Sequence, residues 1–372
     1  MNFCIITHIA HINIHNSYYG YAPYIREMNI WLKSIDKVTV VAPSIIQNID
    51  DLQEPYQHDV INFKKVSDFD ITSLNNGLKA LVSLPKIFYV TFMAMSRADH
   101  IHLRCPGNMG LIGAIVQIAF PWKKKTAKYA GNWDPKAQQP WSYKLQKWLL
   151  SNTFLTRNMQ VLVYGEWPNQ SQNIKPFFTA TYGEDNANEP IIQRDFKNTI
   201  QFLFVGTLSE GKKPMYAVQL VEALVKKGYN VKLSIFGEGK MRDKIHEYCE
   251  TNQLHDCITL HGNKELSFVK TMYKKSHFLI LPSKSEGWPK VVAEAMFWGC
   301  VPLSTAVSCI PFMLDNGKRG KILSLNIHKD VLQITNLLKD MEDYQQISQN
   351  ASDWSRKYTI DYFEKEIAKL LM

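Results

Sequence analysis

The sequence predicts an α/β protein of two Rossmann-like domains, each built on a parallel sheet. Strands and helices alternate with short connections through the second half, and the first half repeats this alternation less regularly. The chain has 372 residues, which is more than one ordinary core organises. Alternation of this kind implies right-handed crossovers and a sheet that helices cover on both faces.

The alternation is clearest in the second half. Residues 201–205 form an apolar run that ends at Gly206, and Pro214 suits the first turn of a helix, where its missing N–H costs nothing. Apolar residues then recur at helical spacing until Gly228, which suits a C-terminal cap. The further predicted elements are strands at 231–236, 258–261, 278–281 and 301–304, and helices at 241–249, 266–275 and 289–299.

The first half contains the same kinds of element. Residues 78–96 are apolar, but Lys79, Pro85 and Lys86 interrupt them. They therefore predict a buried helix with a proline kink, or two helices, rather than a membrane span of about 20 residues. The polar stretch 182–198 is the predicted linker between domains. The other predicted elements are strands at 3–7, 38–42, 100–103 and 126–130, and helices at 22–33 and 140–151.

Charge is distributed unevenly along the chain. The net charge is +9, and residues 1–180 hold 18 Lys and Arg against 11 Asp and Glu. A basic first half favours an anionic partner, such as a phospholipid surface, a lipid-linked diphosphate or a nucleic acid. No nucleic-acid-binding motif is recognisable, which argues against the last of these.

Cysteine and histidine usage indicates neither a disulfide framework nor a metal centre. The six cysteines form no CxxC pair and no targeting segment is recognisable, so we expect a cytoplasmic protein with reduced cysteines. His8, His11 and His15 follow a strand in a loop rather than lying on one helix face. Asp68 and Asp70 imitate an Asp-x-Asp motif, but nothing around them supports it. We therefore expect no metal.

The strongest local signal is the segment 282–299, which follows a buried strand and opens a helix. Parallel sheets bind ligands at the carboxyl ends of their strands, and N–H groups at a helix start can meet an anion. Gly287 allows a ligand to approach the backbone closely. Glu286 and Glu294 are eight residues apart, so both can face one cleft. Taken alone, these carboxylates are also explained as favourable charges near a helix start.

Residues 201–320 resemble the donor-binding domain of the retaining glycosyltransferases of the GT-B fold, the family called family four or group one. The matching pieces follow one another in the family's order, and the last two form its E-x7-E segment. They are residues 204–208 with Lys212, 235–239, 260–262, 281–287 and 294–299.

The resemblance implies two Rossmann-like domains with parallel sheets that face a central cleft. An acceptor-binding domain would cover residues 1–182, a donor-binding domain 199–350, and a helix within 351–372 would cross back to the first domain. The implied enzyme is a hexosyltransferase that moves a hexose-type sugar from a nucleotide-diphosphate donor to a glycan or lipid-linked acceptor. It would retain the anomeric configuration and need no metal or other cofactor. Residues 99–106 and 129–135 look like a bacterial polysaccharide-type subgroup, which implies cell-surface polysaccharide synthesis.

The resemblance also implies residue roles. Glu294 would bind the ribose hydroxyls of the donor, Glu286 would lie near the donor sugar, and Lys212 would neutralise the leaving pyrophosphate. Asn132 and Asp134 stand where many relatives have a catalytic His. The other residues implied at the donor site are Gly206, Thr207, Gly237, Gly262, Gly287, Trp288 and Lys290, and those implied at the acceptor site are Gly20 and Arg104.

Departures from the family pattern leave a second function open. Thr207 stands where the family usually has Arg, and Lys213 or Lys290 is left to compensate. The usual His is absent, and the compact glycine turn near the N-terminus is reduced to Gly20. A non-catalytic nucleotide-sugar binding subunit is therefore the alternative. A sugar-nucleotide epimerase fits the paired glutamates less well.

Aromatic and basic residues gather in two segments of the first half. One is the turn from Trp122 to Lys125, and the other is the helix 140–151, which carries Trp141 and Trp148. Such a surface suits contact with anionic lipid, which would place the protein at the inner face of the cell membrane. Core aromatics beside a solvated basic face explain the same residues, so both interpretations stay open.

Overall fold

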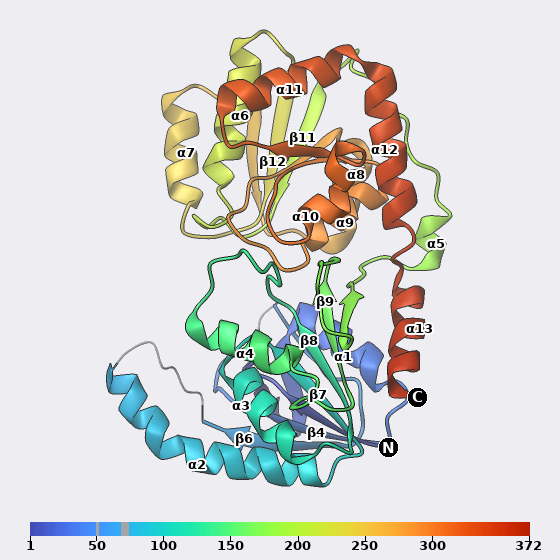
Figure 1. Cartoon of the computed structure of the whole chain (residues 1–372). Helices are drawn as coiled ribbons and strands as arrows, with labels where there is room; N and C mark the ends of the chain where they lie inside the picture. The colour runs from blue at the N-terminus through green and yellow to red at the C-terminus, as the bar shows by residue number, and fades with distance from the viewer. Residues whose placement is uncertain (50–51, 68–73) are drawn as a thin grey trace. The chain divides into compact units, whose positions relative to one another are not determined.

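The computed structural model describes residues 1–49, 52–67 and 74–372, and it divides into two compact units. Unit 1 comprises residues 1–177 and 364–372, and unit 2 comprises residues 178–363. Each unit contains one parallel sheet with helices on its faces (Figure 1). The predicted α/β class with two Rossmann-like units is therefore confirmed. Asp68 and Asp70 lie outside the described residues.

The sheet of unit 1 has seven parallel strands in the order β10-β9-β8-β7-β1-β4-β6. The chain moves outward from β1 in one direction and then returns to build the other half from β7. The carboxyl ends of β1 and β7 therefore form the topological switch point, where open parallel sheets bind ligands. The strands are β1 (Asn2–Ile6), β4 (Lys37–Pro43), β6 (Ile61–Val66), β7 (His100–Cys105), β8 (Lys124–Tyr129), β9 (Met159–Tyr164) and β10 (Ile174–Phe177).

Helices cover both faces of this sheet. Helix α1 (Ala22–Leu32) covers one face, where its Trp31 packs on Phe3 and His102. Three helices share a buried apolar cluster with the other face, namely α2 (Leu74–Ser96), α3 (Asn108–Val116) and α4 (Trp141–Ser151).

Helix α2 differs from the prediction of a buried helix. It is one continuous helix of 23 residues with Pro85 inside it. Ile87 and Met95 are buried, whereas Tyr89 and Phe92 are exposed, so the helix lies on the sheet with one face toward solvent. Across residues 1–49, 52–67 and 74–372, no helix is long and apolar enough to cross a membrane.

A small antiparallel sheet lies near the N-terminus, where the sequence lacks the family's compact glycine turn. It contains β2 (Ile12–Ile14), β3 (Ser17–Tyr21) and β5 (Gln53–Pro55). The two residues between β2 and β3, His15 and Asn16, both have positive φ, as tight hairpin turns require. Gly20 lies inside β3, and a Cβ there would be 3.1 Å from Ile25. The close approach of Ile25 explains the glycine by packing within unit 1, and the role of Gly20 at an acceptor site stays a prediction.

The sheet of unit 2 repeats the same order with six parallel strands, β13-β12-β11-β14-β15-β16. Its switch point lies between β11 and β14. The predicted strands 231–236 and 278–281 match the structure, whereas β16 was not predicted. The strands are β11 (Ile200–Val205), β12 (Val231–Phe236), β13 (Ile258–Gly262), β14 (Phe278–Leu281), β15 (Val301–Thr305) and β16 (Lys321–Leu323).

The helices of unit 2 include one from the stretch that the sequence suggested as a linker. That stretch forms the short helix α5 (Glu184–Ala187) and then packs on unit 2 through the buried Arg194, which donates to the carbonyls of Trp298 and Gly299. The final helix α13 (Ile360–Leu371) begins in unit 2 and ends in unit 1. The others are α6 (Pro214–Lys226), α7 (Arg242–Thr251), α8 (Leu266–Lys275), α9 (Lys290–Phe297), α10 (Ile310–Leu314), α11 (Ile327–Lys339) and α12 (Met341–Ser355).

Buried histidines make the stability of unit 1 depend on pH. Burial lowers the pKa of His11 and of His100 to about 4, from an ordinary 6.5. Between these values the unfolded chain binds protons that the folded chain refuses, so the free energy of unfolding should fall as pH falls.

We predict that His100→Gln makes this fall shallower, as measured by urea unfolding at a series of pH values between about 7 and 4. The matched control is His246→Gln on α7, where the imidazole is exposed. A slope that is the same in wild type and His100→Gln would contradict the argument.

Candidate functional site

The loops after β11 and β14 meet at the switch point of unit 2. Lys212 Nζ lies 2.6 Å from Glu286 Oε1, and the backbone N–H of Lys284 donates to the carbonyl of Gly211 at 2.8 Å. The Glu286 side chain is 8 % exposed and the Lys212 side chain 30 %. Two residues predicted to act together are thus in contact, and the lysine remains accessible to an anion.

Glycines allow the first two loops to pack against each other. A Cβ on Gly237 would be 2.0 Å from the carbonyl oxygen of Gly206, and one on Gly239 would be 2.6 Å from that of Leu208. Both have positive φ, so only glycine fits without strain. A Cβ on Gly206 itself would meet nothing within 4 Å. The loop that carries Lys212 therefore exposes bare backbone to any ligand beside it.

The end of β13 adds an aromatic surface that the sequence analysis missed. Gly262 accepts a hydrogen bond from the N–H of Gly237, which joins the third loop to the second. The ring of His261 stacks on Phe236 with centroids 4.5 Å apart and planes within 8°. The sequence motif around Gly262 was recognised. Phe236, the stacking partner of His261, lies on the neighbouring strand β12, so this contact depends on strand register and could not be predicted from spacing along the chain.

Two other predicted donor-site residues, Gly287 and Trp288, contact other residues of unit 2. The carbonyl of Gly287 accepts hydrogen bonds from Ser308 Oγ and Cys309 Sγ. The indole of Trp288 is buried beside Trp354, so a donor contact from this residue would come from its backbone. These contacts fix the turn that precedes α9, whose first N–H groups have no carbonyl of their own helix to bond.

Glu294 occupies a different environment from Glu286. Its two oxygens accept hydrogen bonds from Thr181 at 2.8 Å and from Tyr273 at 3.1 Å. Burial raises the pKa of this carboxyl, and the charge of Lys290 partly opposes the shift. A cavity of about 10 Å³ lies beside it, which is room for about one water molecule. A ribose could bind Glu294 only if these side chains moved.

The basic residues near the switch point of unit 2 differ in part from those that the sequence predicted to neutralise the diphosphate. Thr207 is exposed and supplies no charge at the position where the resemblance led us to look for Arg. Lys290 interacts with Glu294, so its charge already has a carboxylate nearby. Lys284, which is exposed and follows β14, was not among the predicted residues. Its position two residues before Glu286 is the feature of the sequence that could have identified Lys284 as a site residue.

Unit 1 contains a buried ionic cluster at the carboxyl ends of its central strands. Arg104 and Lys128 are register partners on β7 and β8. Both contact Glu27 of α1, at 3.0 Å and 3.1 Å. The Lys128 side chain is fully buried over the rings of Tyr164 and Phe177. Arg104 was predicted here, whereas Lys128 and Glu27 were missed because only register brings them together.

Asn132 and Asp134 hold a turn together. Asn132 Oδ1 accepts from the N–H of Asp134, and Asp134 Oδ1 accepts from the N–H of Lys136. Lys147 of α4 lies over the Trp133 ring and donates to the carbonyl of Asp134, and burial lowers the pKa of its amine to about 8. Both predicted side chains thus have local partners, and their catalytic role stays a prediction.

The lysine run after Trp122 is not a free basic surface. Lys123 Nζ donates to the carbonyls of Ser96 and Ala98, and Lys125, which is buried, donates to that of Phe120. These contacts favour the plain-core interpretation for Lys123 and Lys125, because backbone oxygens hold their ammonium groups, whereas Lys124 is exposed. The tryptophans behave differently, since Trp122, Trp141 and Trp148 are all more than half exposed.

Nothing in the described part of the chain resembles a metal centre. No group of three or more His, Cys, Asp and Glu side chains there could hold a metal ion. His100 Nε2 and His102 Nδ1 both lie 2.9 Å from Thr126 Oγ1 and stack on Phe3, so they serve the core.

Comparison with known families identifies the second half. Residues 186–354 match the family described as glycosyl transferases group 1. This segment includes both glycine turns, Lys212 and both glutamates. Residues 186–354 therefore carry the domain of the group 1 glycosyl transferases.

Known proteins with similar sequences match this chain over only part of their length. The uncharacterized glycosyltransferase MJ1178 of Methanocaldococcus jannaschii is 28 % identical over 141 residues, which are 38 % of this chain and 39 % of that protein. The poly(glycerol-phosphate) alpha-glucosyltransferase of Bacillus subtilis is 25 % identical over 185 residues, 49 % of this chain and 27 % of that protein. The chain therefore aligns with less than half the length of either relative.

Solved structures share the fold over the whole chain. Anabaena HepE, determined in complex with UDP and glucose, has a TM-score of 0.68 at 12 % identity, covering 99 % of this chain and 98 % of its own. Sucrose-phosphate synthase from Thermosynechococcus elongatus has a TM-score of 0.67 at 15 % identity, and the match covers 100 % of this chain and 98 % of the synthase chain. At these identities the likeness establishes the GT-B fold alone.

The environment of Glu294 separates a ligand role from a structural one. The nucleotide that binds is first identified among UDP, GDP and ADP by calorimetry. If the charged carboxylate holds the ribose, we predict that Glu294→Gln weakens binding of this nucleotide by about 1.5–3 kcal/mol. Thr181→Val, the control, removes one donor to the carboxylate but keeps its charge, so it should lower stability and largely preserve affinity. Unchanged affinity in a folded Glu294→Gln protein would exclude the ribose role.

Proposed function

We propose that this protein transfers a hexose-type sugar from a nucleotide-diphosphate donor to a glycan or lipid-linked acceptor, with retention of anomeric configuration, in the synthesis of a cell-surface polysaccharide. The observation that carries the proposal is the contact between Lys212 and Glu286 at the switch point of unit 2. A cation there suits a diphosphate, and a carboxylate suits a sugar that gains positive charge as its bond to the diphosphate breaks.

The proposed step needs few protein groups. The bond between the anomeric carbon and the diphosphate oxygen breaks, and its electron pair stays on the diphosphate, which Lys212 neutralises. The acceptor hydroxyl oxygen attacks the same face and passes its proton to the departing diphosphate oxygen. Glu286 stabilises the positive charge of the sugar between these events. The step needs no metal, because Lys212 and backbone N–H groups meet the phosphate charge.

The ionic cluster of unit 1 supports an acceptor with an anionic group. Arg104 and the fully buried Lys128 share the Glu27 carboxylate, and the Arg104 side chain is 13 % exposed. The cluster lies at the carboxyl ends of β7 and β8, where a parallel sheet of this order binds ligands. A lipid-linked diphosphate acceptor would meet the partly exposed guanidinium of Arg104 there.

A non-catalytic nucleotide-sugar binding subunit is the second candidate. Two observations favour it: Thr207 supplies no charge at the position where the resemblance led us to look for Arg, and the side chains of Asn132 and Asp134 are engaged in a turn. Such a subunit would bind the donor without breaking its glycosidic bond.

We predict that Glu286→Gln keeps nucleotide affinity and lowers turnover about 10²-fold or more, which is about 2.7 kcal/mol, because its carboxylate serves the reacting sugar. Lys212→Ala should lose both turnover and affinity, since the diphosphate is already anionic in the ground state. The donor is first found by thermal shift among UDP-, GDP- and ADP-sugars, and turnover is then measured as transfer or donor hydrolysis.

The matched controls are Glu210→Gln, an exposed acid of the same loop, and Lys227→Ala, an exposed lysine at the end of α6. Both should behave as wild type. Donor binding without transfer or hydrolysis in the wild type would favour the binding subunit. Wild-type turnover in both site variants would show that the catalytic centre lies elsewhere.

We also propose that the protein works at the inner face of the cell membrane, with α4 in contact with anionic lipid. Trp141, Leu145 and Trp148 are exposed and follow the spacing of one helix face, with Lys144 beside them. Aromatic and basic residues on one helix face favour the interface between water and lipid.

We predict that the protein binds vesicles rich in anionic lipid, and that rising salt weakens the binding because it screens charge. The double variant Trp141→Ser with Trp148→Ser should bind at least about tenfold more weakly in a sedimentation assay. Leu266→Ser, which removes an exposed apolar side chain of unit 2, is the control. Equal binding by the double variant and this control would refute the role of α4.

A further inference from the structure

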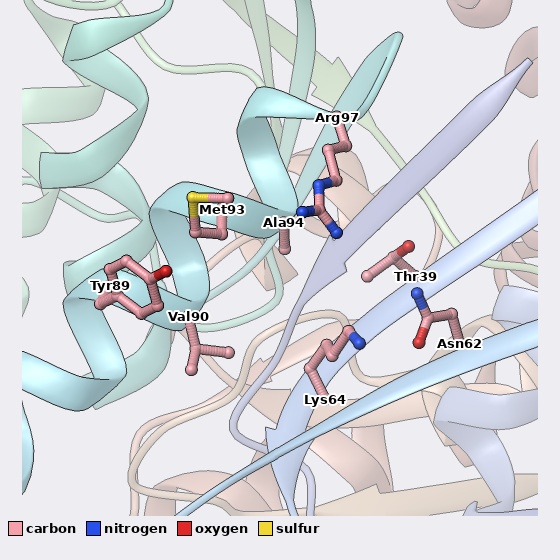
Figure 2. A pocket seen from close by; sticks show the side chains of 8 residues that line it. All are labelled: Thr39, Asn62, Lys64, Tyr89, Val90, Met93, Ala94 and Arg97. Carbon is pink, nitrogen blue, oxygen red and sulfur yellow. The ribbon is translucent and has the colours of Figure 1, made fainter.

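A cavity of about 250 Å³ lies in unit 1 between α2 and the strands β4 and β6 (Figure 2). Helix α2 contributes Tyr89, Val90, Met93, Ala94 and Arg97, and the strands contribute Thr39, Asn62 and Lys64. Thr39 and Asn62 stand near the amino ends of their strands. The cavity is therefore at the edge of the sheet opposite to the carboxyl ends, where Arg104 and Lys128 lie.

The sheet face that α2 covers becomes polar at this point. Thr39 pairs with Cys4 on one side and with Asn62 on the other, and Val41 likewise pairs with Ile6 and Lys64. Cys4, Ile6 and Val41 are fully buried in the apolar cluster that α2 shares. On the edge strand β6 the same face carries Asn62 and Lys64 instead. Helix-covered faces of parallel sheets are normally apolar, so an amide and an ammonium group here need another explanation.

The charges lining the cavity are all positive. Lys64 and Arg97 line it from opposite sides, and no lining residue is acidic. Neither side chain has a hydrogen bond or ion pair with any part of the described chain. Lys123, by contrast, is held by the carbonyls of Ser96 and Ala98. The cavity therefore offers two cations and an amide that have no partner among residues 1–49, 52–67 and 74–372.

The remainder of the lining is apolar. Val90, Met93 and Ala94 present aliphatic and thioether groups, and Tyr89, which is exposed, places its ring at the same helix face. An inorganic ion would use only the cations, whereas a molecule with a charged head and a short apolar part would use the whole surface. The volume is below the range typical of drug-sized ligands, so it suits a headgroup and its first methylene groups.

We propose that this cavity binds an anionic amphiphile, with a phosphate between Lys64 and Arg97, the Asn62 amide donating to it, and an apolar chain against Val90, Met93 and Ala94. Charge-assisted hydrogen bonds from two cations give such a site its affinity for phosphate. The site is separate from the donor and acceptor sites and does not depend on the proposed transfer reaction.

The test uses three soluble probes with the full-length protein in calorimetry at low salt. They are dihexanoyl phosphatidic acid and dihexanoyl phosphatidylcholine, both kept below their micelle concentrations, and inorganic phosphate. We expect phosphatidic acid to bind at least about tenfold more tightly than either of the others, because only it offers both an exposed phosphate monoester and an apolar chain. Lys64→Gln and Arg97→Gln should each weaken this binding by about tenfold or more.

The matched control is Lys65→Gln, the next residue of β6, which is exposed and points to the other face of the strand. It should bind phosphatidic acid as wild type does. Equal losses in Lys65→Gln and Lys64→Gln would reduce the effect to general surface charge and overturn the proposal. Phosphate binding as tight as phosphatidic acid, or no binding of either, would also overturn it.

Nucleotide-sugar binding provides an independent readout of the donor site. Lys64→Gln and Arg97→Gln should leave the thermal shift with the donor unchanged, since both lie in unit 1, at the sheet edge opposite to its carboxyl ends. If no nucleotide sugar binds while phosphatidic acid still does, the proposed function fails and this site stands. The reverse result refutes this site alone.

Discussion

Strand order decides where chemistry can take place in each unit. In both sheets the first strand lies beside the fourth, and the chain leaves these two strands toward opposite edges. The loops that follow them therefore have room to carry functional side chains. Lys212 and Glu286 are 74 positions apart, yet they meet at 2.6 Å because β11 and β14 are neighbours. The glycines at 206, 237 and 239 then allow the adjoining loops to pack without blocking that point.

The two glutamates of the E-x7-E segment show how environment divides one motif into two chemistries. Glu286 has a lysine partner, so its charge is compensated while the site is empty. A diphosphate would compete for that lysine and leave the carboxylate free to face positive charge on the sugar. Glu294 accepts hydrogen bonds from the hydroxyl groups of Thr181 and Tyr273, and burial raises its pKa. Its stabilising contribution is therefore greatest at low pH and is lost as pH rises through its elevated pKa.

The elements of unit 2 could be predicted because parallel strands buried on both faces read as continuous apolar runs, as 231–236 and 278–281 do. Strand β6 was missed because Asn62, Lys64 and Lys65 interrupt its apolar pattern. The contact of Glu27 with Arg104 and Lys128 could not be predicted either. It depends on the register of β7 with β8 and on the packing of α1, neither of which leaves a local signal. Motif spacing identified the loops after β11, β12 and β14, whereas partners from other strands required the fold.

The same reasoning changes what the positive charge of the first half means. A count of lysines and arginines treats them as one basic surface, but several are neutralised or enclosed within unit 1. Arg104 and Lys128 share Glu27, while Lys123 and Lys125 bind backbone carbonyls. Lys64 and Arg97, by contrast, line an apolar cavity and have no partner among the described residues. Cations placed beside apolar side chains in this way would select anions by shape as well as by charge.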